Sequence, residues 1–432
     1  MDASGSIYGT TIDGGAHGSG SGFRFYGARG GHWRLRRGNQ TMEPPMSKQN
    51  DLSKSLVALE QDATLIAVVE MGQASWLVAG IVPGLDRYPL KKLGPDRDAL
   101  LQLLHRWREQ AAKVGHAINR IAVAYEAGRD GFWLARWLRT WSIEAYVIHP
   151  SSVPVPREHR RAKTDRLDTE LLKRAFVGWL RGEPKHCSMA AIPTLEDEDT
   201  RRPGRERQTL VGERTRVLNR LKANLARLGI RGFRPNLARA QSQLETLRTP
   251  EGSAIPKNTL AEMRRDMDRL QVVKRQIKEI EKTRAERLSK EPSERRSAMV
   301  RQLGRVVGVG VETADMLVQE VFSREIRDRR ALARYAGLTG APDESGQRRR
   351  ERGLAKAGNS RVRRGMIELA WGHLLHQKGS PLTEWFWKRA SDARGGTRKT
   401  MIVALARKLL IVLWRLATTG ETPAGLRLRP AP

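Results

Sequence analysis

Short apolar runs alternate with helical periodicity between Ala63 and Leu180, and this alternation limits the possible folds more than any other feature. The first run, Thr64–Val69, is typical of a buried strand, and Ser75–Ala79 is predicted as its hairpin partner. Apolar spacing predicts the remaining elements: strands at Tyr88–Leu93, Ile121–Tyr125 and Ala145–Ile148, and helices at Asp96–Val114, Trp133–Trp141 and Thr164–Leu180. This order predicts an α/β domain over residues 60–190, with a mixed sheet and helices on its faces.

The second half of the chain has a different periodicity. One apolar stripe recurs at spacings of three and four, through Met263, Met267, Leu270, Val273, Ile277 and Ile280, and another runs through Leu218, Leu221, Leu225 and Leu228. These stripes predict a coiled coil or long helical hairpin over residues 200–292, used as an arm for self-association. Residues 298–420 are predicted to be mostly helical, with an irregular segment at Gly337–Asn359, so the fold class is α/β plus all-α. Residues 1–45 are rich in Gly, Ser and Arg and are predicted to be disordered.

The charge of the chain indicates its partner. The 432 residues include 79 Lys and Arg against 47 Asp and Glu, a net charge of +32. Such a surplus of positive charge repels itself unless a polyanion neutralises it, which favours nucleic acid as a partner.

Cys187 is the single cysteine, which excludes an intrachain disulfide and a cysteine-based zinc site and is consistent with a reducing, intracellular setting. No apolar run reaches the roughly 18 residues of a membrane span, so no membrane partner is predicted.

Four carboxylates stand where a two-metal site would need them. Glu70 ends the first predicted strand, Glu126 ends the strand after the long helix, and Asp165 and Asp168 open the last helix of the α/β domain. Spacing of three residues places the two aspartates on one helical face. Clustered carboxylates repel one another unless a cation binds them, and oxygen ligands suit Mg²⁺ or Mn²⁺. Taken singly, each residue also has a purely structural interpretation, as a strand cap, a helix-dipole partner or an ion-pair partner of Arg161 or Arg166.

Glycines mark a second candidate site. Gly304–Gly310, followed by Glu312-Thr-Ala314 at the start of a helix, resembles the hairpin of a helix-hairpin-helix element. Backbone N–H groups at such a helix start, near Gly308 and Gly310, bind phosphate without reading sequence. A glycine-rich connection between two helices is the alternative.

Two groups of motifs resemble those of a known protein family. The segment Arg161–Asp168, with Tyr125–Gly128 and His149-Pro150 upstream, resembles the N-terminal domain of IS110-family transposases, which is similar in fold to RuvC resolvases and ribonuclease H. By position, Glu126, Asp165 and Asp168 match the last three residues of the family's Asp-Glu-Asp-Asp motif. Glu70 stands where the family usually has Asp, one methylene shorter.

The C-terminal motifs extend the resemblance. They are Tyr335–Pro342, Glu344-Ser-Gly346, Lys356–Asn359 and Arg361–Arg364. The resemblance implies that Ser345 is the nucleophile, which from the sequence alone is a loop serine. Nucleic-acid contacts are predicted at basic and turn residues around these motifs: Arg160, Arg161, Lys163, Arg166, Gly308, Gly310, Arg348, Arg349, Arg350, Arg352, Lys356, Asn359, Arg361, Arg363 and Arg364.

The resemblance implies a transposase that mobilises an insertion sequence through a phosphoserine intermediate. It further implies a dimer or tetramer on double-stranded DNA, guided by a structured RNA from the element, in the bacterial cytoplasm at the nucleoid. Two alternatives stay open. One is a RuvC-type junction nuclease that uses water as its nucleophile, and the other is a nucleic-acid-binding protein without catalysis.

Overall fold

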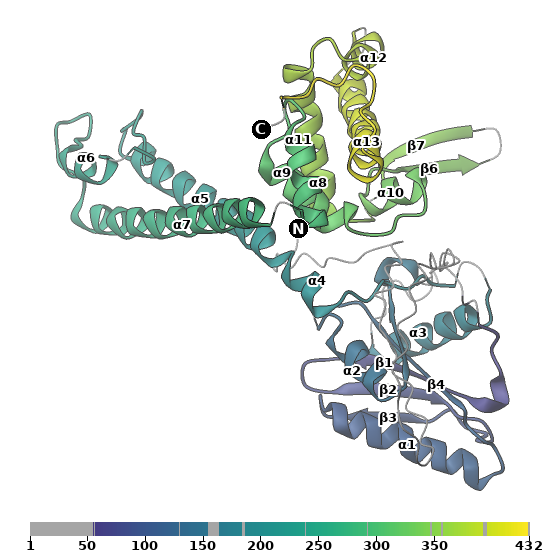
Figure 1. Cartoon of the computed structure of the whole chain (residues 1–432). Helices are drawn as coiled ribbons and strands as arrows, with labels where there is room; N and C mark the ends of the chain where they lie inside the picture. Colours follow the sequence, from purple (N-terminus) through teal and green to yellow (C-terminus); the bar gives the residue numbers. More distant parts are fainter. Residues whose placement is uncertain are drawn as a thin grey trace, which may run out of the picture. The chain divides into compact units, whose positions relative to one another are not determined.

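A computed structural model describes residues 55, 57–128, 130–153, 164–183, 186–237, 239–291, 293–345, 348–355, 357–391 and 395–430 (Figure 1). The tail predicted at residues 1–45 lies outside these ranges. The described residues divide into two compact units: one contains the residues up to Thr194 together with Arg324–Arg415, the other Leu195–Ser323 together with the segment from Leu416.

A five-stranded mixed sheet forms the centre of the α/β part. Its strands lie in the order β3-β2-β1-β4-β5. The central strand β1 is antiparallel to β2 and parallel to β4, and β4 is parallel to β5. The bounds are β1 Thr64–Met71, β2 Trp76–Ile81, β3 Leu90–Leu93, β4 Arg120–Glu126 and β5 Glu144–Ile148. All five predicted strands and the mixed character of the sheet are confirmed.

Helices cover both faces of this sheet. Alternate residues of β1 point to opposite faces: Leu65, Ala67 and Val69 pack in the core with α1 (Arg97–Lys113) and α2 (Trp133–Thr140). Ile66 and Val68 pack in a separate core with α3 (Asp165–Leu180). On β1 and β4, even-numbered side chains therefore face α3, and odd-numbered side chains face α1 and α2.

The second unit is built on a long helical hairpin. It begins with α4 (Leu195–Asp199), and its longest helices are α5 (Arg202–Arg227) and α7 (Lys257–Lys290), which pack along each other with α6 (Ala240–Thr246) at the tip (Figure 1). The apolar stripes pack against each other, with Leu221, Met263 and Met267 fully buried. The helical-hairpin interpretation is thus confirmed, and the two stripes pack against each other within one chain, with Leu218, Leu228 and Ile280 only half-buried.

Shorter helices follow the hairpin. They are α8 (Arg295–Gly304), α9 (Val311–Leu317) and a π-helical turn, η4 (Val318–Phe322). The segment near the C-terminus adds one bridge to this unit, between Val306 and Leu428.

Helices and one β-ribbon make up residues 324–419. The elements are α10 (Arg329–Tyr335), β6 (Gly340–Ser345), β7 (Arg348–Leu354), α11 (Ser360–His376), α12 (Pro381–Ala390) and α13 (Gly395–Thr419). The prediction of an irregular Gly337–Asn359 segment was wrong, because β6 and β7 pair there as an antiparallel ribbon. Helix α12 was not predicted, and α13 begins before the predicted Thr400. Among the described helices, none is long and apolar enough to cross a membrane.

Candidate functional site

Glu70 and Glu126 occupy equivalent positions on neighbouring parallel strands. The last register partners of β1 and β4 are Val69 and Tyr125, and each glutamate follows directly. Their even-numbered neighbours Ile66, Val68, Ala122 and Ala124 all lie in the core under α3, so alternation places both carboxylates on the α3 face. Adjacent strands are about 4.8 Å apart, which brings the two side chains close together at the carboxyl edge of the sheet.

The two glutamates differ in exposure. Glu70 is half-buried and its Oε2 atom is fully buried, whereas Glu126 is exposed at the end of its strand. Burial disfavours the ionised form of a carboxylate, so a cation bound nearby would stabilise a half-buried acid such as Glu70 more than an exposed one.

Asp165 and Asp168 lie in the first turn of α3. Thr164 caps this helix, its hydroxyl accepting a hydrogen bond from the Leu167 amide at 3.3 Å. At the other end, the Ser55 amide, which precedes β1, donates to the carbonyl of Trp179 at 3.0 Å. Ala58 in turn accepts a bond from Arg120 at the start of β4. The C-terminus of α3 therefore lies at the amino ends of the parallel strands, and its first turn points toward their carboxyl ends.

The two glutamates and the first turn of α3 thus lie on one face and at one edge of the sheet, but the four carboxylates do not form a closed metal site. Within the described ranges, no group of three or more His, Cys, Asp or Glu side chains lies close enough to hold a metal ion. The donors are all oxygen, which fits Mg²⁺ or Mn²⁺. They come as two separate pairs, one on the sheet and one on the helix.

The basic residues predicted beside this site are only partly described. Arg160, Arg161 and Lys163 lie outside the described residues. Arg166 is exposed in the first turn of α3, beside Asp165.

Ser345 is the last residue of β6 in the C-terminal ribbon. The register places Ser345 opposite Arg348, Glu344 opposite Arg349 and Asp343 opposite Arg350. The backbone pairing therefore brings the predicted nucleophile together with three of the predicted phosphate-binding arginines. Arg352 lies further along β7, and Lys356 lies outside the described residues.

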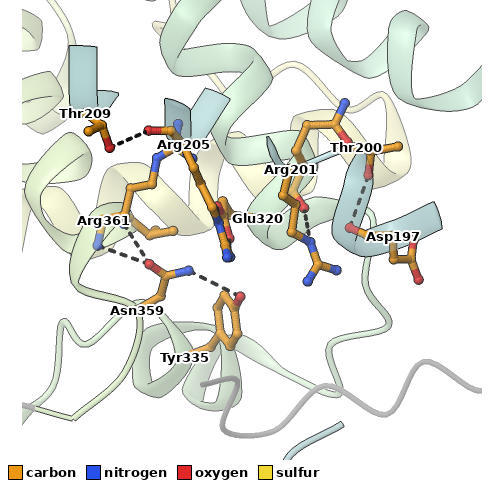
Figure 2. Close-up of polar contacts among 11 residues, drawn as sticks. Asp197, Thr200, Arg201, Arg205, Thr209, Glu320, Tyr335, Asn359 and Arg361 are labelled. Carbon is orange, nitrogen blue, oxygen red and sulfur yellow. Dashed lines mark hydrogen bonds and ion pairs between the residues drawn. The ribbon is translucent and has the colours of Figure 1, made fainter. Parts of the chain in front are cut away.

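Asn359 fixes the start of α11. Its Oδ1 accepts hydrogen bonds from the amides of Arg361 at 3.1 Å and Val362 at 3.3 Å, and its Nδ2 donates to the Tyr335 hydroxyl at 3.4 Å (Figure 2). Asn359 is buried, so its side chain holds α11 against α10. Arg361, Arg363 and Arg364 follow in the first turns of α11, with the Arg363 guanidinium donating to the carbonyl of Ala357 at 3.1 Å.

A glycine is essential at the turn before α11. Gly358 has φ of 85°, and a Cβ there would lie 2.5 Å from the carbonyl oxygen of Arg334 and 2.6 Å from the amide of Gly337. Only glycine permits both this backbone conformation and this close approach of α10. The glycine of the Lys356–Asn359 motif is therefore explained by its close approach to the C-terminal end of α10.

The glycine turn between α8 and α9 forms hydrogen bonds with the segment near the C-terminus. Gly308 has φ of 94°, which favours glycine, whereas a Cβ on Gly310 would meet nothing within 4 Å. The Val307 amide donates to the carbonyl of Arg427 at 3.0 Å, and Arg429 bonds the carbonyl of Arg305. The segment near the C-terminus therefore takes one of the N–H groups in the turn that was predicted to face phosphate.

A network of buried charges, which was not predicted, links the hairpin to α9. Arg284 on α7 is buried and forms ion pairs with Glu312 and with Asp315 (3.1 Å) on α9. Arg207 on α5 binds Glu281 at 2.7 Å and Glu312 at 3.1 Å. Several arginines of this basic chain are thus used to hold its own helices together.

Further pairs extend the network toward α4 and η4. Arg205 binds the fully buried Glu320, which lies beside it in Figure 2, through two hydrogen bonds of 2.9 Å. Arg296 binds Asp197 on α4. The sequence signal for these contacts is weak: the isolated acids Glu312, Asp315 and Glu320 stand within an otherwise apolar segment, where a buried carboxylate needs a cation.

Comparison with known proteins identifies the family. The chain is 37% identical over 399 residues to "Putative transposase y4rJ" of Sinorhizobium fredii (strain NBRC 101917 / NGR234), an alignment that covers 90% of this chain and 98% of the relative. Residues 300–383 also match the model of the transposase IS116/IS110/IS902 family. The chain belongs to this transposase family. A more distant relative is the transposase for insertion sequence element IS1533 of Leptospira borgpetersenii, 26% identical over 67% of this chain and 79% of the relative.

Family membership confirms the predicted activity in outline. The protein is a transposase, and DNA is its substrate. The family match spans Ser345, the ribbon and the start of α11, which are the elements that the C-terminal motifs singled out.

Proposed function

We propose that this transposase moves an insertion sequence by cutting and rejoining DNA through Ser345, assisted by a carboxylate site on the sheet. The observation that carries the proposal is the equivalent placement of Glu70 and Glu126, on the face that α3 covers and at the edge toward which Asp165 and Asp168 point. The strand order β3-β2-β1-β4-β5, with β1, β2 and β3 paired antiparallel and β1, β4 and β5 paired parallel, supports a RuvC- or ribonuclease H-like domain.

Glu70, Glu126, Asp165 and Asp168 would hold Mg²⁺ or Mn²⁺. Such an ion, when bound, polarises a phosphodiester and stabilises the oxygens that attack and leave. The protein contributes two ligands from the rigid sheet and two from the first turn of α3. Glu70 is one methylene longer than the aspartate usual in the family, so it reaches further from its strand.

Ser345 would act as the nucleophile. Its hydroxyl oxygen forms a bond to phosphorus while one bond between phosphorus and a sugar oxygen breaks, and the leaving sugar oxygen takes up a proton. Attack by the hydroxyl of another DNA end on the phosphoserine reforms a phosphodiester and returns the proton to Ser345. A serine hydroxyl is a weak nucleophile until a base or metal activates it, which the carboxylate site would provide.

The surrounding basic residues would bind the DNA backbone. Arg348, Arg349 and Arg350 lie on β7, whose backbone pairs with the strand that ends at Ser345, so we assign them to the binding of the DNA around the reacting phosphate. Arg361, Arg363 and Arg364 lie at the start of α11, which Asn359 holds in place. Arg160, Arg161, Lys163, Arg166, Arg352, Lys356 and the Gly308–Gly310 turn complete the proposed nucleic-acid contacts.

The proposal includes an assembly of several chains in the bacterial cytoplasm, at the nucleoid. A dimer or tetramer binds double-stranded DNA and a structured guide RNA encoded by the element. Each active site combines the carboxylates of one chain with Ser345 of another, and the domain boundaries follow the predicted ones, at residues 60–190, 200–292 and 298–420.

Denaturing electrophoresis tests the nucleophile. The purified protein is incubated with the terminal DNA of its element, the adjacent non-coding RNA and Mg²⁺. A covalent protein–DNA adduct that is absent in Ser345→Ala and retained in Ser297→Ala, a buried serine on α8, is the expected result. Cleaved DNA without an adduct would instead identify water as the nucleophile and favour a junction nuclease, and salt-sensitive binding without cleavage would favour a binding protein.

Mixing variants tests the shared active site. Chains with Asp168→Ala and chains with Ser345→Ala are each expected to be inactive alone and to recover strand exchange when mixed. Recovery requires that one chain supply its intact carboxylates and another its serine. If the mixture stays inactive while both variants still assemble, each chain works with its own site.

A further inference from the structure

The α5–α7 hairpin has a break in its apolar interface. One core cluster, toward the tip, contains Val217, Leu221 and Leu270, and a second, toward the base, contains Leu210, Val273 and Ile277. Arg214 lies four residues after Leu210 and three before Val217, so it takes a position in the apolar stripe of α5. A half-buried arginine thus stands where the pattern predicts an apolar residue.

Lys274 faces this break from α7. The ion pairs Arg207–Glu281 and Arg220–Asp266 fix the antiparallel register on either side of it. Lys274 is half-buried, and its Nζ donates to the carbonyl of Asn236 at 3.3 Å. Burial lowers the pKa of Lys274, and the positive charges of Arg214 and Lys278 lower it further.

Three carboxylates that flank this cluster are bound to other cations. Glu281 is paired with Arg207, Asp266 with Arg220 and Arg269, and Glu213 with Arg216. The charged neighbours that shift the pKa of Lys274 are both cations. Arg214 and Lys274 are half-buried and Lys278 is exposed beside them. Like charges held this close destabilise the helix pair, and an anion bound among them would offset that cost.

The hydrogen bond from Lys274 to Asn236 places two more arginines near Lys274. Arg234 and Arg239 lie within three residues of Asn236, so their Cα atoms are at most about 11 Å from its Cα. Both side chains are exposed. Between Arg201 and Lys290, Lys and Arg outnumber Asp and Glu by more than two to one.

We propose that Arg214, Lys274 and Lys278 form a binding site for the phosphodiester backbone of a nucleic-acid duplex along the middle of the hairpin. An ammonium and a guanidinium held together in a partly dehydrated position bind phosphate oxygens strongly. The contact is to the backbone, so it positions the duplex without reading its sequence. The proposed contact can be tested by nucleic-acid binding alone, so the test does not require catalysis by Ser345 or the four carboxylates.

Binding of the full-length protein to a 40-base-pair DNA and to an RNA hairpin of equal length tests this site. We compare Arg214→Gln/Lys274→Gln with the control Arg216→Gln/Lys282→Gln, which removes two cations already paired with Glu213 and Glu286. Loss of two phosphate contacts should weaken binding about tenfold at 0.15 M salt and reduce the slope of log K against log salt by about 2. The control should change Kd less than twofold.

A second pair of substitutions separates binding from folding. Arg214→Leu/Lys274→Met completes the apolar interface, so it should keep or raise the melting temperature while weakening binding as much as the glutamine pair. Weaker binding to the DNA alone identifies DNA as the occupant, and weaker binding to the RNA alone identifies RNA. Unchanged affinity and slope for both ligands would overturn the proposal, as would a lower melting temperature for both variant pairs.

Discussion

Glu70 and Glu126 each stand one residue beyond a register pair, Val69 and Tyr125, on the two central parallel strands of the sheet. Two carboxylates at this spacing repel each other, and a divalent cation held by both would offset the repulsion. Their closeness follows from strand register alone and does not depend on how α3 begins.

Metal binding should therefore stabilise the protein through Glu126. We expect Mg²⁺ at ten times its Kd to add about 1.4 kcal/mol to the free energy of unfolding, which EDTA removes. Glu126→Gln should abolish this gain and, without metal, melt at the same or a higher temperature than the parent, because one of two repelling charges is gone. Thermal melts with and without Mg²⁺ measure both effects. Glu109→Gln, at an exposed position of α1, serves as the control and should keep the full response.

Asp266 should be the most sensitive acid of the hairpin. It is fully buried on α7 and accepts two hydrogen bonds of 2.6 Å from Arg220 and one of 2.8 Å from Arg269, which hold its pKa below the usual range. Asp266→Asn should lower the free energy of unfolding by about 2 kcal/mol, since both partners are exposed enough to be rehydrated. Asp268→Asn, two residues further on an exposed face, should cost little. Equal losses in urea denaturation would contradict the role of burial.

His373 should make the stability of the protein depend on pH. It is buried between α11 and α12, 2.8 Å from the Ser380 hydroxyl, and burial lowers its pKa to about 4. The unfolded chain, with a pKa near 6.5, binds a proton first as the pH falls, so stability is full above about 6.5 and is lost toward pH 4, by up to about 3 kcal/mol. His373→Gln should flatten this part of the stability profile. The exposed His376→Gln should leave the profile unchanged.

Cys187 should be inert toward thiol reagents in the folded protein. It lies buried under α3, with its Sγ 3.4 Å from the carbonyl of Ala175, and burial raises its pKa to about 12. At pH 8 only about one molecule in 10⁴ then carries the reactive thiolate. Reaction with a disulfide reagent should become rapid only at denaturant concentrations that unfold the α/β part. Rapid labelling under native conditions would show that α3 opens locally.

The sequence predicts the α/β part closely because its core elements have strong periodicity. Thr64–Val69 and Ile121–Tyr125 are apolar on both faces, as expected for strands covered by helices on both sides. The ribbon was missed for the opposite reason. Gly340–Ser345 contains Gly, Pro and Asp, and Arg348–Leu354 is mostly charged, so neither segment shows strand propensity or alternation. Pairing, and not composition, makes them strands.

The sequence predicts which residues are candidate metal ligands, but it does not predict how the fold arranges them. Strand ends identify Glu70 and Glu126, and helix spacing identifies Asp165 and Asp168, but only the fold shows that each pair belongs to a different element. The arginines are harder to assign. Arg284 and Arg205 look like nucleic-acid contacts in the sequence, yet both bind buried carboxylates of the same unit, a pairing set by the packing of distant helices.

The ion pairs that join Arg207, Arg284 and Arg287 to α9 also have a mechanical consequence. They fasten both helices of the hairpin at one end, so the pair can swing only if buried charges separate. Helix α7 has 34 residues and is about 51 Å long. A tilt of about 5° at its base would therefore displace the tip by about 4 Å, close to the rise of one base pair. Because the ion pairs to α9 resist tilting of the hairpin, they would hold its tip in position to within about the length of one nucleotide.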